Sequence, residues 1–451
     1  MPPSGRAEEG VVFPADGAGR RSTIAAGKAV FAAAARAGGD AALADAIMAE
    51  PNWRKSYAKH VTKVAETSAA SAEAALKVAE AGLAAISSSF EFVRDGKTTT
   101  LADAMAAPRA TKFRTGKVMG SAPPSRVVEV PHNGRDLSGD ALAAQLRTWT
   151  EYGCAEPGVE SAIASLATGG GVELTGKVFI VLGATSALGP LASLLKWGAT
   201  VLAVARPKPA SWSKLISAAR ASAGTFLFPV RAAVSDDDAA LAAEAGADLI
   251  DETPEILAWL QSTLAQLRCT DPVVGMYTYL DSDAHVKVSI ASDLIMTALA
   301  PAGSKASLAY IQTPSLAYDI PAEAREASVA AYSRAWLSML GYLPNARPAV
   351  AQTSPPRYIH DGMLNLQGPN YALAKTMQMW RSLLARSRDQ IAVSSNCAPA
   401  ARTASMVAGD NKNAGAVAAG LDGMRLFKPM MVFEQVRAMG SGQGQESGFM
   451  G

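Results

Sequence analysis

A tyrosine and a lysine four positions apart are the residues of this chain best suited to acid–base chemistry. Tyr371 and Lys375 follow Gly368-Pro369-Asn370 and lead into a predicted helix over 376–386. Residues four apart on a helix share one face. A phenol has a pKa of about 10, and a neighbouring ammonium lowers that value because it favours the phenolate. Such a phenol can donate a proton to a developing alkoxide and take it back in the reverse reaction.

A turn bounded by two glycines lies between two apolar runs. The run 177–182 predicts a buried parallel strand, the turn spans 183–189, a helix is predicted over 191–197, and a second strand over 201–205. The first glycine allows a sharp bend and the last lets the helix begin close to the strand. Because a helix N-terminus offers unpaired N–H groups and a positive dipole end, this turn is typical of a pyrophosphate site. The predicted cofactor-binding residues here are Gly183, Thr185, Ser186, Ala187, Leu188 and Gly189.

The end of the second predicted strand indicates which dinucleotide fits. An acidic residue there hydrogen-bonds a ribose 2′-hydroxyl, whereas a basic residue suits a 2′-phosphate. The strand ends in Ala205-Arg206, and Lys208 lies close by. We therefore predict that Arg206 contacts the cofactor and that the cofactor is NADP, with NAD as the alternative.

The order of these features resembles that of the short-chain dehydrogenase/reductase family. The glycine turn, the later YxxxK helix and a following strand over 390–396 occur in the family's order, and the resemblance covers about 174–406, with a last strand expected at 430–433. It implies a doubly wound sheet, a nicotinamide cofactor, and hydride transfer to or from a carbonyl carbon. It also implies that Tyr371 is the acid/base and that Lys375 orients the ribose and tunes Tyr371.

The resemblance implies further that Pro399 begins a loop over the nicotinamide, with Thr403 among the cofactor contacts. Departures from the family's pattern are Ser186 and Ala187 in place of a middle glycine, and Ala400 after Pro399. Gly275-Met-Tyr-Thr-Tyr279 stands where the family has Asn-Asn-Ala-Gly.

The catalytic hydroxyl of the family lies at the end of the strand before the YxxxK helix. The candidate strand is 306–311, and its end offers Thr313 and Ser315, either of which carries the required donor. Ser354 and Tyr358 are alternatives. An insertion over about 316–368, with a predicted helix over 322–340, separates this strand from the tyrosine.

Asp281, Asp283 and His285 form a D-x-D-x-H pattern after the predicted fourth strand. In extended chain such residues point to one side, as metal ligands do. We expect a solvated turn at the strand end and predict no metal, with His285 as a candidate substrate contact at the carboxyl end of the sheet.

Composition excludes several classes of protein. The 451 residues are 49% hydrophobic and 18% charged, which excludes a disordered chain. Lys and Arg number 42 and Asp and Glu 40, so the chain lacks the strong basic excess that would predict a nucleic-acid partner. Three cysteines without a CxxC pair exclude a disulfide framework and favour a reducing compartment, so we expect a cytoplasmic protein. The apolar stretch 178–205 is interrupted by Gly, Pro and Lys, which argues against a membrane span.

The chain divides into an N-terminal helical part and a C-terminal nucleotide-binding part. We predict an α/β, doubly wound parallel sheet (Rossmann-like) over 172–440 after a mostly helical region over 22–168, with flexible tails over 1–21 and 441–451. Helices over 23–49 and 53–90 should form a hairpin that rests on the main domain or a second subunit.

The function predicted from these features is an NADP-dependent oxidoreductase of the carbonyl reductase or alcohol dehydrogenase type. Its partners would be a small-molecule or carrier-bound carbonyl substrate and a second copy of the chain. Two alternatives remain open: a non-catalytic nucleotide-binding or scaffold protein on the same fold, and a sugar-nucleotide epimerase-like isomerase.

Overall fold

The structure is a computed structural model of the whole chain. It describes residues 8–107, 112–132, 135–151, 157–233, 235–334, 346–348, 354 and 356–397. The predictions for Pro399, Thr403, the strand at 430–433 and the tail at 441–451 lie outside these residues.

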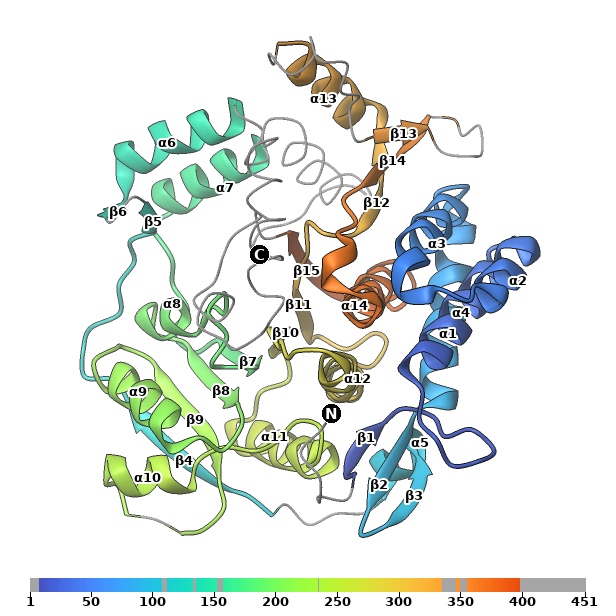
Figure 1. The fold of residues 1–451 in the computed structure, drawn as a ribbon. Helices are drawn as coiled ribbons and strands as arrows, with labels where there is room; N and C mark the ends of the chain where they lie inside the picture. The colour runs from blue at the N-terminus through green and yellow to red at the C-terminus, as the bar shows by residue number, and fades with distance from the viewer. Residues whose placement is uncertain are drawn as a thin grey trace.

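A seven-stranded sheet forms the centre of the molecule, in the order β15-β11-β10-β7-β8-β9-β4 (Figure 1). Six neighbouring strands are parallel, and β4 lies antiparallel to β9 at one edge. This is the predicted Rossmann-like α/β fold. The strands are β4 (Arg114–Met119), β7 (Val178–Leu182), β8 (Thr200–Val204), β9 (Thr225–Val230), β10 (Val273–Met276), β11 (Ser307–Gln312) and β15 (Ala392–Cys397).

Helices cover both faces of the sheet because its strands carry apolar side chains on both sides. Ile180 and Leu182 point into one core with α11, α12 and α14, whereas Val181 points into a second core with α8, α9 and α10. These helices are α8 (Leu191–Lys196), α9 (Pro209–Arg220), α10 (Asp238–Glu244), α11 (Thr253–Leu267), α12 (Asp283–Leu299) and α14 (Pro369–Ser387).

The strand order reverses direction beside β7. From β7 the chain winds outward through β8 to β9, and it then returns to β10 on the other side of β7 and winds outward through β11 to β15. In open parallel sheets, ligands bind outside the carboxyl ends of the strands at such a reversal. The segments after β7, β10 and β11 therefore surround the expected binding crevice.

Four N-terminal helices lie beside α14, of which α1, α3 and α4 pack on it and α2 packs on α1 and α3 (Figure 1). Each predicted long helix is broken in two, at 38–40 and 69–71, where Asp40 and Ser71 cap the second helix of each pair. Gly82 allows close packing, since a Cβ there would lie 2.1 Å from the Trp380 ring. The helices are α1 (Thr23–Ala37), α2 (Ala41–Ala49), α3 (Trp53–Ser68) and α4 (Ala72–Ser89).

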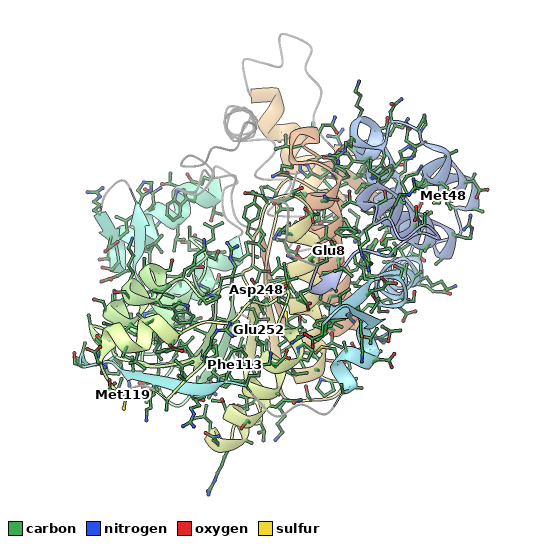
Figure 2. The ribbon with its side chains drawn as sticks, turned by 60° about the horizontal axis from the view of Figure 1, so that its bottom comes forward. Glu8, Met48, Phe113, Met119, Asp248 and Glu252 are labelled. Carbon is green, nitrogen blue, oxygen red and sulfur yellow. The ribbon has the colours of Figure 1, made fainter. Side chains whose placement is uncertain are left out.

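Two N-terminal segments differ from the expectation. Residues 10–12 were expected in a loose tail, but they form β1 (Gly10–Val12) beside β2 (Glu91–Arg94), which pairs in turn with β3 (Lys97–Thr100). The apolar side chains of Val11 and Val12 are fully buried there. In addition, β4 joins the central sheet, so the mostly helical region is not separate from the Rossmann-like fold. Figure 2 labels Phe113 and Met119 at the two ends of β4.

The long insertion forms a small sheet and a helix. Strands β12 (Ala317–Pro321), β14 (Arg357–Asp361) and β13 (Ala346–Pro348) are antiparallel. The predicted helix at 322–340 is described as α13 (Ala322–Arg334).

The remaining elements are α5 (Leu101–Ala106), β5 (Val130–His132), β6 (Arg135–Leu137), α6 (Gly139–Glu151), α7 (Pro157–Thr168) and a 3₁₀ turn, η2 (Asn365–Gln367). Within the described part of the chain, no helix combines the length and the apolar character that crossing a membrane requires.

Candidate functional site

Tyr371 and Thr313 meet in a direct hydrogen bond at the carboxyl edge of the sheet. The Tyr371 hydroxyl donates to Thr313 Oγ1 at 2.8 Å. Helix α14 begins at Pro369, earlier than predicted, so Tyr371 stands in its first turn and Lys375 one turn later. Thr313 directly follows β11 and is buried. The predicted tyrosine and one of the two predicted hydroxyl residues therefore form one site.

Neighbouring groups hold Thr313 in place. The backbone N–H of Ser315 donates to Thr313 Oγ1 at 3.1 Å, and the Tyr318 hydroxyl donates to the Thr313 carbonyl oxygen. Ser315 thus contributes its backbone, and its own buried hydroxyl has no partner among the described residues. Of the alternative hydroxyls, Ser354 is exposed and Tyr358 lies on β14 opposite Ile320. Of the predicted hydroxyl residues, Thr313 is therefore the one whose side chain contacts Tyr371.

Lys375 is tied to the end of the same strand. Its ammonium donates to the Ile311 carbonyl oxygen and to Gln378 Oε1, each at 3.1 Å. The Gln378 amide nitrogen donates to Ser289 Oγ on α12 at 3.2 Å. The side chains of Gln378 and Ser289 were not predicted to take part. Their signal in the sequence is weak, because a glutamine three residues after a lysine is common on any helix.

His285 packs against Tyr371 rather than in a solvated turn. The expected turn is wrong at this position, because Asp283 begins α12 and places His285 in its first turn. The His285 and Tyr371 rings stack with centroids 5.5 Å apart and an interplanar angle of 22°, and the half-exposed Tyr279 contacts both rings. Among the described residues, no group of three or more His, Cys, Asp or Glu side chains could hold a metal ion.

His285 is electrically neutral at physiological pH. Complete burial, aided by the charge of Lys375, lowers the pKa of its imidazole to about 3. The Leu280 N–H donates weakly to Nδ1 at 3.4 Å, which assigns the ring proton to Nε2. The ring that stacks on Tyr371 from α12 therefore carries no charge near neutral pH.

The glycine turn borders this site. Gly183 has φ +91°, and a Cβ there would lie 2.9 Å from the Tyr277 carbonyl oxygen and the Thr278 nitrogen after β10. The turn closes on itself through hydrogen bonds from Ser186 and Gly189, whereas the amides of the exposed residues 185, 187 and 188 donate to no group that the structure describes. Three exposed backbone amides without a described acceptor therefore lie at the switch point.

Arg206 lies exposed two residues after the end of β8, the neighbour of β7. Its backbone is fixed because the Trp212 indole N–H donates to the Arg206 carbonyl oxygen at 3.0 Å. Lys208 is exposed just before α9. The predicted basic residue therefore stands at the strand end where a ribose is read.

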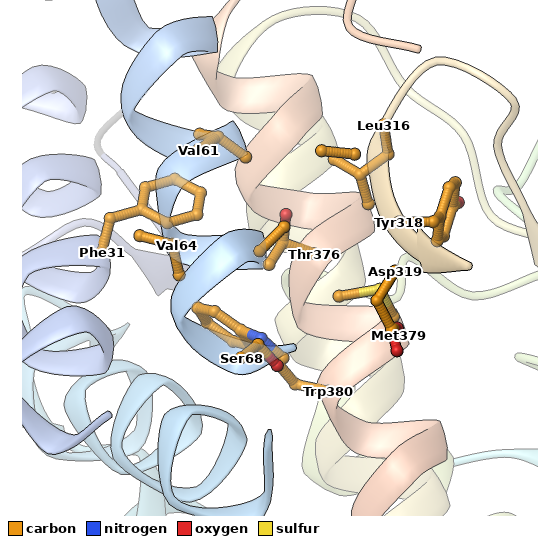
Figure 3. A pocket seen from close by; sticks show the side chains of 12 residues that line it. Phe31, Val61, Val64, Ser68, Leu316, Tyr318, Asp319, Thr376, Met379 and Trp380 are labelled. Atoms are coloured by element: carbon orange, nitrogen blue, oxygen red, sulfur yellow. The ribbon is translucent and has the colours of Figure 1, made fainter. Parts of the chain in front are cut away.

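A cavity beside α14, between this helix, α3 and β12, is too small to be the substrate site (Figure 3). Its volume is about 30 Å³, which accommodates one or two water molecules. Val64, Thr376 and Trp380 are among the side chains that line it, and Thr376 Oγ1 is buried without a partner in the described structure. The cavity faces α3 and β12 and is separate from Tyr371 and Lys375.

Comparison with known proteins identifies no relative of this chain. No family model matches it, and neither a curated protein nor a solved structure matches it. The fold and the geometry of the site are therefore the basis for the function proposed next.

Proposed function

We propose that this protein is an NADP-dependent oxidoreductase of the carbonyl reductase or alcohol dehydrogenase type. The observation that supports this best is the hydrogen bond between Tyr371 and Thr313 at the carboxyl edge of the sheet. It lies beside Lys375 and close to a glycine turn at the reversal of strand order. Open α/β sheets bind dinucleotides in this crevice.

The residues around the crevice fit a dinucleotide. Gly183 keeps the turn free of a side chain, and the amides of the exposed residues 185, 187 and 188 suit pyrophosphate oxygens. Arg206 carries a positive charge to the expected place of a 2′-phosphate. When bound, the nicotinamide supplies the redox chemistry, which is a property of the cofactor rather than of the protein.

The side chains of the site would manage the proton. In the reductive direction Tyr371 donates its phenolic proton to the carbonyl oxygen as negative charge develops there. Thr313, which accepts from Tyr371, can turn its own hydroxyl hydrogen toward the same oxygen and stabilise that charge. The Lys375 ammonium favours the phenolate that remains. His285, with a pKa of about 3, is not the proton donor near neutral pH.

Calorimetric titration with NADPH and NADH tests the cofactor assignment. We expect micromolar binding of NADPH and much weaker binding of NADH. Arg206→Glu should abolish the preference, whereas Lys214→Glu, the same charge change at an exposed site on α9, should leave it unchanged. If a folded sample that carries no co-purified nucleotide binds neither compound, the proposal is wrong and a scaffold on a nucleotide-binding fold becomes the better hypothesis.

The substrate class, the assembly and the compartment complete the proposal. We propose a small or carrier-bound carbonyl compound as substrate, a homo-oligomer as the assembly, and the cytoplasm as the compartment. Light scattering of the purified chain tests the assembly directly, and a monomer at working concentration would contradict it.

A further inference from the structure

Helices α12 and α14 are joined by a row of side chains along their shared face. On α12, His285, Ser289 and Asp293 recur every four residues and therefore lie on one side of the helix. His285 stacks on Tyr371, and Asp293 forms a two-point ion pair with Arg381 at 2.8 Å. The middle position, Ser289, contacts Gln378 of α14, which in turn contacts Lys375.

The chemistry of the middle contact fixes the orientation of the Gln378 amide. An ammonium can only donate, so the amide atom that faces Lys375 must be the oxygen. The amide nitrogen then points the other way and needs an acceptor, which Ser289 Oγ provides at 3.2 Å. Both side chains are sealed from solvent, with Gln378 1% exposed and Ser289 fully buried. Water therefore cannot replace either partner.

We infer that Gln378 is the positioning residue of the Lys375 ammonium and that Ser289 holds Gln378 in the orientation this requires. The inference rests on the proposed function, because Lys375 matters to catalysis only if Tyr371 is the proton donor. Without the Ser289 acceptor, the buried amide nitrogen has no partner, and a flipped amide would direct a donor toward a donor. The ammonium also donates to the Ile311 carbonyl oxygen, so its position is set jointly from β11 and, two contacts away through Gln378 and Ser289, from α12.

Four variants test whether Ser289 and Gln378 position Lys375 in this way. Gln378→Met removes the amide and keeps the length of the side chain. Ser289→Ala removes a hydroxyl that does not touch Lys375, and the double variant combines the two changes. Ser292→Ala is the matched control, since Ser292 is equally buried on α12 but donates to the Val288 carbonyl oxygen of its own helix. Thermal unfolding of each variant establishes that it folds before it is compared.

The direct measurement is proton exchange of the Lys375 ammonium with water. It is followed by nitrogen-15 NMR of side-chain-labelled lysine, with the signal assigned by Lys375→Met. We expect exchange to accelerate about tenfold in Gln378→Met and in Ser289→Ala, with no further change in the double variant, and to stay at the wild-type rate in Ser292→Ala. Equal rates in Ser289→Ala and Ser292→Ala would overturn the inference.

NADPH titration of the same variants separates the two proposals. We expect Gln378→Met and Ser289→Ala to weaken binding about tenfold relative to Ser292→Ala. If the wild type binds no nucleotide but the proton exchange of Lys375 changes in the variants as expected, the proposed function is wrong. The inferred positioning of Lys375 by Gln378 and Ser289 is then still supported. If the wild type binds NADPH but Ser289→Ala changes neither the proton exchange of Lys375 nor the NADPH affinity, only the inferred roles of Gln378 and Ser289 are wrong.

Discussion

Acidification should destabilise this protein through His285 by an amount that follows from its burial. The imidazole has an ordinary pKa of 6.5 in the unfolded chain and a pKa of about 3 in the folded chain, because it is fully buried. The folded value is the lower one, so the unfolded chain binds an extra proton as pH falls below 6.5. The contribution of the neutral His285 to the free energy of unfolding is therefore fully present above pH 6.5. It decreases as the pH falls from 6.5 to about 3.

The size of the effect at pH 5 can be worked out from these two values. One pH unit of differential protonation corresponds to about 1.4 kcal/mol, and pH 5 lies 1.5 units below the unfolded pKa of 6.5. His285 alone should therefore cost about 2 kcal/mol of unfolding free energy between pH 7.5 and pH 5. His285→Phe, which keeps a ring beside Tyr371 and cannot titrate, should remove that part of the loss.

Urea unfolding at the two pH values measures the difference for each protein. Any pH-independent cost of losing the imidazole cancels, since only the change between pH values is compared. Tyr279→Phe is the control, because it keeps the ring that contacts His285 and should lose as much stability as the wild type. The reasoning is refuted if His285→Phe and wild type lose the same free energy on acidification.

Three further predictions concern the site and its support. Arg381→Met should destabilise the protein by about 3 kcal/mol, because the carboxylate of the buried Asp293 is left unpaired, and chemical denaturation should show partial recovery when Asp293→Asn is added. Gly183→Ala should abolish NADPH binding in a titration, because its Cβ would contact backbone atoms at 2.9 Å and its φ of +91° disfavours a side chain; unchanged affinity would contradict this. Thr313→Val should lower kcat about 100-fold with little effect on NADPH affinity, because it removes a hydroxyl placed to stabilise the developing oxyanion. Steady-state kinetics measures this loss, and failure of Thr313→Ser to restore the rate would count against that role.

Local patterns in the sequence predict the central features of the fold. The alternation of apolar strand, glycine turn, helix and strand over 177–205 predicted β7, α8 and β8 because each signal lies within a few residues. The four-residue spacing of Tyr371 and Lys375 likewise predicted a shared helical face. Thr313 was predicted because it follows a strand, yet its choice over Ser315 needed the three-dimensional structure.

Features that depend on distant contacts were not predictable in this way. Strand β4 joins the central sheet by pairing with β9, more than 100 residues later, and no periodicity within 114–119 reveals such a partner. Val11, expected in a loose tail, is buried in a strand that pairs with β2 about 80 residues later, and its N–H donates to the Ile250 carbonyl oxygen. His285 gave the wrong local expectation, since a D-x-D-x-H pattern suits a turn as well as a helix start. Its stacking on Tyr371 arises only when α12 and α14 are side by side.

The most direct test of the proposed function is carbonyl-dependent oxidation of NADPH by the wild type and by Tyr371→Phe. A panel of aliphatic, aromatic and thioester-linked ketones and aldehydes is assayed by the loss of NADPH absorbance, with NADPH affinity measured in parallel. We expect at least one carbonyl compound to be reduced by the wild type, and Tyr371→Phe to bind NADPH normally while losing at least 100-fold in rate. Equal turnover by the two proteins would contradict the assignment of Tyr371 as the proton donor.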